Sequence, residues 1–476
     1  MRDYLKFYIN GSWIDPAEPN AAAVIDPATE QVAGHISLGS AADVDAAVDA
    51  ARRAFPAWMR TGREERINLL ERIATEYGRR HNDVAEAIIS EMGAPWDLAE
   101  GTQTAIGLSH LQAAIDALKD YRFEELRGTT RIVREPIGVC AFITPWNWPI
   151  NQIVCKVVPA LAAGCTMVLK PSEIAPFSAV IWAEILDAAG VPPGVFNLIN
   201  GDGPTVGEAL ASHPHVDMVS FTGSTRAGVR VAIAAAPTIK RVHQELGGKS
   251  PHIVLDDDAL PKSVVWGVHA VALNAGQNCN APTRMLVPRP RLAETIELAR
   301  EAADGLRVGP PRTSPDIGPV ISETQWNRIQ SLINQGIKEG ATLIAGGPGR
   351  PAGLEEGYYV RPTVFADVTN EMTIAREEIF GPVLAIIAYD DVDHAIEIAN
   401  DSPYGLAAYV SGKDMDAVRT IAAELRAGQV NLNGAPPDFM APFGGYKQSG
   451  NGREWGDHAI TEFLETKAVL GHGAAL

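Results

Sequence analysis

The chain has 476 residues, of which 46% are hydrophobic and 21% are charged, and its formal net charge is −18 at pH 7. This length exceeds the size at which a single hydrophobic core stops growing, so we expect two or three domains. The acidic balance disfavours nucleic acid and anionic membrane surfaces as partners, because both require a basic surface.

The sequence carries no pattern of export or of membrane insertion. Residues 1–7 include no uninterrupted apolar run, and no stretch of about 18 apolar residues occurs in the chain. Cys140, Cys155, Cys165 and Cys279 form no CxxC pair, and four cysteines in so long a chain do not indicate a disulfide framework. The histidines show no metal-ligand spacing. We therefore expect a cytoplasmic protein without a bound metal.

The first 120 residues predict a hairpin followed by helices. Asn10 and Gly11 lie between alternating apolar residues, which is a strong hairpin pattern. Ser40 and Asp43 have the spacing of a capping box at a helix start. Amphipathic helical periodicity then continues to about residue 120. We assign no chemistry to this part of the chain.

From residue 139 onward, strand and helix patterns alternate. In the first α/β region, strands are expected at 139–144, 166–169, 195–199, 216–221 and 241–246, with helices at 150–163, 176–189 and 226–235. In a second region, from about 248 to 465, strands are expected at 252–255, 383–389 and 429–432, with helices at 292–305, 322–339 and 392–399. This alternation predicts parallel sheets covered on both faces, with ligands bound at the carboxyl ends of the strands.

Cys279 differs from the other three cysteines in its surroundings. It lies in the segment Asn274–Arg284, among amides, small residues and a glycine, whereas Cys140, Cys155 and Cys165 lie in apolar runs. Structural cysteines prefer apolar neighbours. A polar segment is where a thiolate can be formed and reached. We interpret Cys279 as a nucleophile.

Two further residues are candidates to assist this nucleophile. Glu245 ends the last strand of the first region among apolar and small residues, where desolvation raises a carboxyl pKa toward that of a general base. The alternative is a surface glutamate in a glycine linker. Asn147, in the loop Pro145–Pro149, has an amide that can face an oxyanion. The alternative is an asparagine that holds its own turn.

Glycines and polar residues at other strand ends suit a dinucleotide. Gly223 and Gly228 bracket a turn before a helix whose first amides can hold a pyrophosphate. Gly203 and Gly207, which follow the third strand, nearly match the glycine spacing of a dinucleotide-binding turn. Plain connections are the alternative for both. Lys170 and Glu173 suit the hydroxyls of a ribose, and Glu173 would repel a 2′-phosphate, which favours NAD over NADP. Here the alternative is a solvated turn capped by Ser172.

Seven motifs together carry a resemblance. In order and spacing, the chain resembles the NAD(P)-dependent aldehyde dehydrogenase superfamily over nearly its whole length, through Pro145–Asn147, Lys170–Glu173, Phe221–Ser224, Glu245–Lys249, Gly276–Cys279, Glu377–Pro382 and Pro442–Lys447. The resemblance implies an α/β subunit with two Rossmann-like, doubly wound domains and a small β arm. The cofactor domain would be 1–117 and 137–247, the catalytic domain 248–464, and the bridging element 118–136 and 465–476. Such proteins are homodimers or homotetramers.

The resemblance also implies roles for individual residues. Cys279 would attack an aldehyde, Asn147 and the Cys279 peptide N–H would hold the oxyanion, and Glu245 would activate the water that releases the acid. Lys156 and Glu454 match positions tied to proton relay or cofactor placement. The implied cofactor residues are Ile143, Pro145, Trp146, Lys170, Ser172, Glu173, Gly203, Gly207, Phe221, Gly223, Ser224, Gly228, Leu246, Glu378 and Phe380.

The implied aldehyde tunnel contains no lysine or arginine to hold a second carboxylate. Its residues would be Trp148, Gln152, Cys155, Asn278, Asn280, Pro437 and Phe443. We therefore expect a neutral, medium-sized aliphatic or aromatic aldehyde. Two alternatives remain: an enzyme that transfers the acyl group to coenzyme A, and a non-catalytic structural protein on the same fold. The presence of Glu245 counts against the first, and the complete set Cys279, Glu245 and Asn147 counts against the second.

Overall fold

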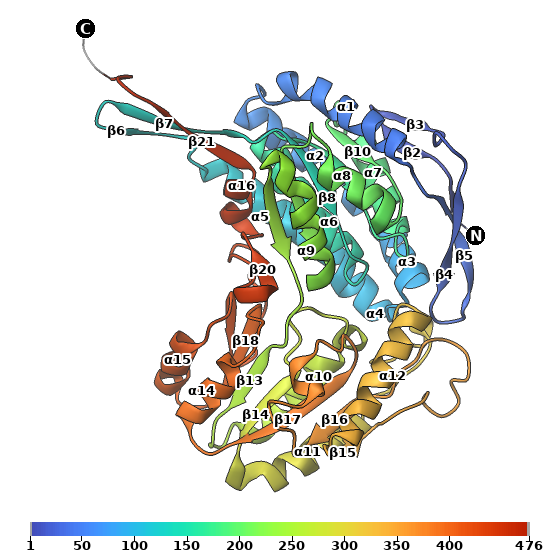
Figure 1. The fold of residues 1–476 in the computed structure, drawn as a ribbon, viewed down its shortest axis with the longest axis vertical. Helices are drawn as coiled ribbons and strands as arrows, with labels where there is room; N and C mark the ends of the chain where they lie inside the picture. Colours follow the sequence, from blue (N-terminus) through green and yellow to red (C-terminus); the bar gives the residue numbers. More distant parts are fainter. Residues whose placement is uncertain (1, 474–476) are drawn as a thin grey trace.

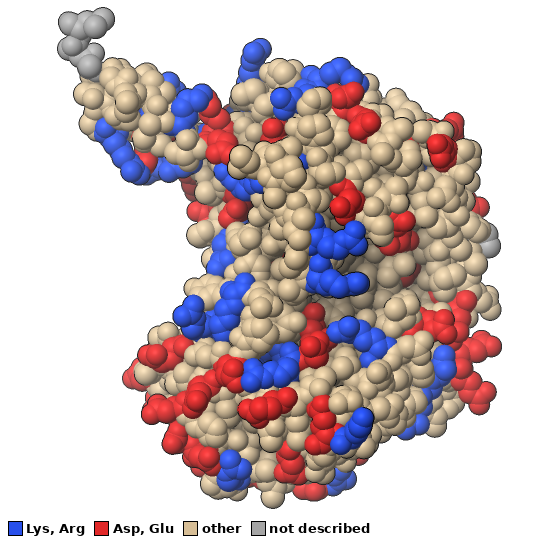
Figure 2. All heavy atoms as spheres, viewed as in Figure 1, with Lys and Arg blue, Asp and Glu red and all other residues tan. Residues whose placement is uncertain are grey.

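The computed structural model describes residues 2–473 and shows two lobes with a thin β arm that projects from the first lobe (Figure 1). Within these residues, no helix combines the length and the apolar character needed to cross a membrane. Acidic and basic side chains are interspersed over the face shown in Figure 2.

The first lobe is built on an eight-stranded sheet in the order β20-β12-β11-β8-β9-β10-β2-β3. Its central strands are parallel: β8 (Val139–Ile143), β9 (Thr166–Lys170), β10 (Phe196–Leu198), β11 (Met218–Thr222) and β12 (Arg241–Glu245). The antiparallel edges are β2 (Phe7–Ile9), β3 (Ser12–Ile14) and β20 (Gly450–Asn451). At the expected hairpin, Asn10 and Gly11 both have positive φ, 53° and 75°, as a tight two-residue turn requires.

Helices cover both faces of this sheet. The helices of the lobe are α1 (Ala41–Trp58), α2 (Arg63–Arg79), α3 (His81–Met92), α4 (Trp96–Leu98), α5 (Ala105–Asp120), α6 (Pro149–Ala163), α7 (Phe177–Ala188), α8 (Glu208–Ser212), α9 (Thr225–Ala235) and α16 (Gly456–Glu462). Successive residues of β8 point to opposite faces: Val139 and Ala141 pack with α1, α8 and α9, whereas Cys140 and Phe142 pack with α2, α5, α6 and α7. Strands β8, β9 and β11 are largely apolar because both of their faces are buried, whereas β12 carries the polar residues His243, Gln244 and Glu245.

The second lobe repeats this design on a seven-stranded sheet in the order β15-β16-β17-β14-β13-β18-β19, in which β15 alone is antiparallel. Its strands are β13 (Pro251–Val254), β14 (Arg284–Pro288), β15 (Thr342–Ala345), β16 (Thr363–Ala366), β17 (Val383–Tyr389), β18 (Ala407–Ser411) and β19 (Gln429–Leu432). Its helices are α10 (Leu260–Ala272), α11 (Leu292–Asp304), α12 (Glu323–Lys338), α13 (Thr373–Arg376), α14 (Val392–Asn400) and α15 (Met415–Glu424). Helices α10 and α11 cover one face, and α12, α14 and α15 the other.

Two small sheets complete the fold. The first has the order β1-β5-β4 and consists of β1 (Arg2–Tyr4), β4 (Ala21–Asp26) and β5 (Gln31–Ser37). The arm has the order β21-β7-β6 and consists of β6 (Glu124–Arg127), β7 (Thr130–Pro136) and β21 (Leu464–Val469). Residues 474–476 of the expected bridging element lie outside the described residues.

The C-terminal part of the chain returns to the first lobe before it enters the arm. Strand β20 pairs with β12, so that Gly450 lies opposite Glu245, and α16 packs against α5 and α6. Strand β20 and helix α16 fall within the expected catalytic domain, 248–464. The pairing of β20 with β12 therefore places the C-terminal end of that expected domain with the sheet of the first lobe. A two-residue strand has no periodicity of its own, which is why the sequence did not indicate this return.

Candidate active site

A cavity of about 260 Å³ lies between the two lobes. It opens beside the carboxyl ends of β8, β11 and β12, the position that a parallel sheet offers to a ligand. Its lining residues are Pro145, Trp146, Asn147, Gln152, Thr222, Gly223, Ser224, Leu246, Gly247, Cys279, Gln325, Arg328, Glu378 and Phe380.

Cys279 reaches this cavity from a constrained loop that follows α10. Asn274, Ala275 and Gly276 have consecutive positive φ values of 55°, 56° and 74°. Such conformations are unfavourable for residues with a side chain and persist only where the surroundings enforce them. A β-carbon at Gly276 would overlap the carbonyl of Gly381, so only glycine fits there. The backbone is therefore bent sharply just before the cysteine.

Asn147 ties the loop after β8 to the Cys279 loop. Its Nδ2 donates to the carbonyl oxygen of Gln277 at 3.0 Å, and its own carbonyl accepts from Asn274 Nδ2 at 2.9 Å. Because these partners lie in the other lobe, the alternative in which Asn147 only holds its own turn is wrong. The amide has two N–H groups, so one remains for a ligand in the cavity.

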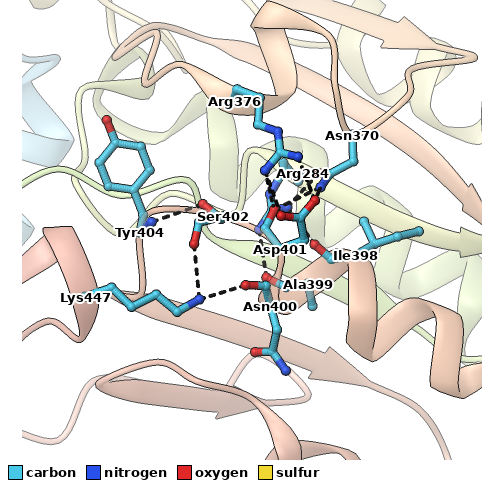
Figure 3. Close-up of polar contacts among 10 residues, drawn as sticks. All are labelled: Arg284, Asn370, Arg376, Ile398, Ala399, Asn400, Asp401, Ser402, Tyr404 and Lys447. Atoms are coloured by element: carbon cyan, nitrogen blue, oxygen red, sulfur yellow. Dashed lines mark hydrogen bonds and ion pairs between the residues drawn. The ribbon is translucent and has the colours of Figure 1, made fainter.

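Arg284 anchors the other end of the Cys279 loop, and Figure 3 shows its side chain beside Asn370, Ile398 and Ala399. Its buried guanidinium donates to the Lys249 carbonyl at 3.0 Å, to Asn370 Oδ1 at 2.9 Å, and to the carbonyls of Ile398 and Ala399 at 2.9 and 3.0 Å. Four bonds in several directions fix both the side chain and the backbone from which it projects.

Two glycines allow the lobes to touch. A β-carbon on Gly247 would overlap the carboxylate of Glu378, and one on Gly248 would overlap the Cys279 carbonyl. The Gly248 N–H donates to Glu378 Oε1 at 3.1 Å. The segment that follows Glu245 therefore passes directly between Cys279 and Glu378.

Burial raises the pKa values of three acidic groups of the site. It raises the pKa of Glu245 well above its usual value, and the nearby Glu454 raises it further. Desolvation also raises the pKa of the Cys279 thiol, and Glu378 and Glu245 add to the effect. The sequence suggested surroundings in which a thiolate forms readily; instead, the thiol is neutral at pH 7, so a base has to remove its proton. Burial raises the pKa of Glu378 to about 7.

Lys156 and Glu454 form a buried ion pair. Burial opposes both charges, but Glu454 raises the pKa of Lys156, and Lys156 lowers that of Glu454. The Cys155 thiol donates to Glu454 Oε2 at 3.4 Å. Since Glu454 also influences Glu245, this pair belongs to the electrostatics of the site.

The expected ribose ligands lie together at the end of β9. Lys170 Nζ lies 3.1 Å from Glu173 Oε2. A β-carbon added at Gly207 would lie 4.0 Å from the side chains of both Lys170 and Ile143, so the three positions border one space. Ser172 lies between the lysine and the glutamate in the chain, and Gly203 begins the turn that ends at Gly207.

The start of α9 approaches the end of β12. The Ser224 hydroxyl accepts from the Ala227 N–H at 3.3 Å and caps this helix. A β-carbon on Gly228 would lie 2.6 Å from Leu246 Cδ2, and one on Gly223 would lie 2.6 Å from the Phe221 ring. Both glycines thus permit close packing, and Gly223 and Ser224 also line the cavity.

Two cavity residues, Gln325 and Arg328, were not predicted from the sequence. Gln325 donates to the carbonyls of Ile379 and Phe380 at 3.1 and 2.8 Å, and Arg328 donates to the Glu378 carbonyl at 2.9 Å. They hold the segment that presents Glu378 and Phe380. Polar residues on an amphipathic helix such as α12 resemble a solvated face, so the sequence offered no sign of this role.

Of the expected tunnel residues, Gln152 is the one that lines this cavity. The Trp148 indole N–H donates to Asn278 Oδ1, and Asn278 Nδ2 donates to the Leu273 carbonyl at 2.8 Å, so these two side chains bind each other and the backbone. The Asn280 carbonyl accepts from the Tyr409 hydroxyl at 2.9 Å. Phe443 stacks on Trp455 with ring centroids 4.7 Å apart, and Pro437 is exposed.

Comparisons with known proteins agree with this arrangement. The model of the aldehyde dehydrogenase family matches residues 13–469. The chain belongs to the aldehyde dehydrogenase family. It is 58% identical to a 3-succinoylsemialdehyde-pyridine dehydrogenase of a Pseudomonas species, over 99% of both chains.

Solved structures of aldehyde dehydrogenases have the same fold. Aldehyde dehydrogenase C of Pseudomonas syringae, solved as a variant with NAD+ and octanal, has a TM-score of 0.98 and 55% identity, with 99% of this chain and 97% of that chain covered. An aldehyde dehydrogenase of Mycobacterium tuberculosis in complex with NAD+ has a TM-score of 0.96 and 41% identity, with 98% of both chains covered. The predicted family, the two Rossmann-like domains and the class of enzyme are confirmed.

The Arg284 anchor gives a test of the loop. Arg284→Lys should lower the free energy of unfolding by roughly 2–4 kcal/mol, because an ammonium cannot satisfy four buried acceptors spread around a planar guanidinium. Arg376→Lys is the matched control, since Arg376 forms an exposed pair with Asp401 (Figure 3) and its loss should stay within about 1 kcal/mol. Chemical denaturation measures both, and equal losses would contradict the anchoring role.

Proposed function

We propose that this aldehyde dehydrogenase oxidises a neutral, medium-sized aldehyde to its carboxylic acid, with NAD as the hydride acceptor. The observation that carries this proposal is the position of Cys279: its thiol faces a cavity at the carboxyl ends of the first sheet, next to the Asn147 amide. When NAD is bound there, it supplies the acceptor for the hydride that leaves the aldehyde carbon.

The first half of the reaction belongs to Cys279 and Asn147. The thiol sulfur attacks the aldehyde carbon while the thiol proton passes to the carbonyl oxygen, and this oxygen of the thiohemiacetal takes hydrogen bonds from the free N–H of the Asn147 amide and from the Cys279 peptide N–H. Loss of the hydride, and of the hydroxyl proton to solvent, leaves a thioester on Cys279. The loop geometry supports this role, since Asn147 and Cys279 are held to one another through Gln277 and Asn274.

The second half belongs to Glu245. In its ionised form, Glu245 takes a proton from water as the water oxygen bonds to the thioester carbon, and when the carbon–sulfur bond breaks to release the acid, the Cys279 sulfur takes this proton from Glu245 and the thiol is restored. Burial supports Glu245 as the base, because a carboxyl group with a raised pKa holds a proton more firmly than an exposed one. No observation favours coenzyme A transfer or a purely structural role.

Several contacts support NAD as the cofactor. Lys170 and Glu173 would bind the adenosine ribose, and Glu378 the nicotinamide ribose. The Trp146 and Phe380 rings, with centroids 5.3 Å apart and planes at 86°, form one wall of the cavity. A carboxylate at Glu173 would repel a 2′-phosphate, so we propose a preference for NAD over NADP.

The choice of aldehyde follows from the charges around the cavity. Arg328 is the basic residue among the lining residues, and it binds the Glu378 carbonyl on the cofactor side. A substrate that carries a carboxylate in addition to its aldehyde group would therefore leave this charge without a partner, and burying an unpaired charge is unfavourable. Octanal and 3-succinoylsemialdehyde-pyridine, which are named for two relatives, are also aldehydes without a carboxylate.

Exposed apolar residues support assembly into a homodimer or homotetramer. On α9, Val229 and Ile233 lie one turn apart and are 53% and 68% exposed, and on the arm Leu126 is 62% exposed. Copies of the chain would cover them. The four cysteines are free, which supports the cytoplasm as the compartment.

Cys279→Ala should abolish NADH production and leave NAD binding intact, because the variant lacks the attacking sulfur but keeps the cofactor residues. NADH absorbance and a cofactor titration measure the two properties. Cys140→Ala is the control, since this cysteine is buried in the sheet, and it should keep its turnover. Turnover in Cys279→Ala would disprove the nucleophile.

Glu245→Gln should slow acid release by roughly a hundredfold, the lower end of what a general base contributes. The first hydride transfer should slow less, since a new thioester forms before water is needed. Stopped-flow absorbance should therefore show a burst of NADH followed by a slow steady state. An unchanged steady-state rate would exclude Glu245 as the base.

The proposed substrate class predicts a ranking of aldehydes. Hexanal and benzaldehyde should have kcat/KM values roughly tenfold or more above that of succinic semialdehyde, because the latter would bury an unpaired carboxylate. Initial rates of NADH formation over a concentration series measure this. A preference for succinic semialdehyde would overturn the assignment.

A further inference from the structure

His243 and Glu245 form an isolated pair of buried polar side chains. They lie two residues apart on β12, so both side chains project from the same face of the sheet. Each residue is 3% exposed, and His243 Nε2 lies 3.5 Å from Glu245 Oε1. Within residues 2–473, neither ring nitrogen and neither carboxyl oxygen has a hydrogen-bond partner. Four such atoms at one place call for a functional explanation, because buried polar groups are almost always paired.

The C-terminal return of the chain closes over this pair. A β-carbon on Gly444 would lie 2.7 Å from Glu245 Oε1, and one on Gly452 would lie 2.9 Å from His243 Nε2. Between them, Gly450 lies opposite Glu245 in the β12–β20 ladder. Because these covering residues are glycines, they leave space for the two side chains. The covering segment and β12 together enclose the His243–Glu245 pair.

The charged groups around the pair come from three elements. Lys156 lies on α6, Glu454 and Arg453 lie on the segment after β20, and Glu462 ends α16. Burial lowers the pKa of His243 to about 4, with Glu454 opposing the effect and Lys156 and Arg453 adding to it. Burial raises the pKa of Glu245. Both shifts favour the uncharged form of each side chain, in which the proton lies on the carboxyl group.

A protonated carboxyl group cannot accept a proton from water. Glu245 must first transfer its own proton, and its enclosure separates it from solvent. His243 Nε2 lies 3.5 Å from Glu245 Oε1 and is a ring nitrogen that can accept this proton. Catalytic hydrogen bonds are often longer in the absence of substrate.

We propose that His243 is a positioning residue for Glu245. The His243 Nε2 takes up the proton of the Glu245 carboxyl group, and the resulting Glu245 carboxylate accepts a proton from the hydrolytic water. This inference rests on the proposed function, in which Glu245 is the base.

The protons balance over one hydrolysis. The Glu245 O–H bond breaks and an N–H bond forms on His243. Water then gives one proton to Glu245, and its oxygen bonds to the thioester carbon. As the carbon–sulfur bond breaks, its electron pair returns to Cys279, which takes the proton from Glu245. His243 finally returns its proton to the carboxylate, and the pair is restored.

The test is the pH profile of acid release in the full-length His243→Gln variant. Glutamine has a similar reach but does not take up a proton. We expect the NADH burst to stay within about twofold of the wild type, because hydride transfer precedes hydrolysis. The steady-state rate at pH 7 should fall roughly tenfold, and its acidic limb should move up by about one pH unit, since the Glu245 proton must then leave to solvent.

His252→Gln is the matched control. His252 is also fully buried, its Nδ1 also lacks a partner, and it lies on β13 of the other lobe, where its Nε2 contacts Ser411 Oγ at 2.8 Å. This variant should keep the wild-type pH profile. It separates the effect of removing a buried histidine from the effect of removing this one.

The outcomes distinguish the inference from the proposed function. A wild-type profile in His243→Gln, together with slow acid release in Glu245→Gln, would overturn the role of His243 alone. Fast acid release in Glu245→Gln would overturn the proposed function itself. If His243→Gln does not fold, ¹⁵N shifts of labelled histidine in the wild-type protein decide the matter: the inference requires Nδ1 to carry the resting proton, and a proton on Nε2 would contradict it.

Discussion

The contact between the Cys279 loop and the glycine pair after Glu245 fixes the geometry of the site. Gly247 and Gly248 allow the Glu378 carboxylate and the Cys279 carbonyl to approach the first lobe, and Gly276 allows the same loop to pass Gly381. The contacts of Gly248 with Cys279 and of Gly276 with Gly381 are made by backbone atoms, so the loop lies closer to its neighbours than a side chain at either glycine would allow. Arg284 fixes the end of the loop, and Asn147 fixes its start.

Enclosure gives this geometry its chemical properties. The same close approach that positions Cys279 removes water from it and from Glu245, and both groups are consequently held in their neutral forms. A nucleophile and a base that are both protonated at rest do not react until protons are moved. The Lys156–Glu454 pair influences the pKa of Glu245, and His243 Nε2 lies 3.5 Å from Glu245 Oε1.

Local patterns in the sequence identified much of the fold and of the site. The Asn10-Gly11 turn, the apolar strands β8, β9 and β11, and each of the seven motifs depend on residues close together in the chain. The return of residues 450–462 to the first lobe depends on pairing with β12, about two hundred residues earlier, and no local pattern encodes it.

The substrate side of the site was harder to predict for the same reason. Asn278 appeared free to contact a substrate, yet its amide binds Trp148 and the Leu273 carbonyl. Gln325 and Arg328 belong to a helix whose polar residues resemble a solvated face, and their role depends on the carbonyls of residues 378–380, which lie in the loop between α13 and β17. Spatial neighbours, rather than residue types, decide these roles.

Mass spectrometry of acid-quenched turnover tests the central claim most directly. Protein mixed with NAD and hexanal, quenched within one turnover and digested, should carry the mass of a hexanoyl group on the peptide that contains Cys279, and on none of the peptides with Cys140, Cys155 or Cys165. Turnover with no acyl group on Cys279, or with the acyl group on another cysteine, would contradict the account.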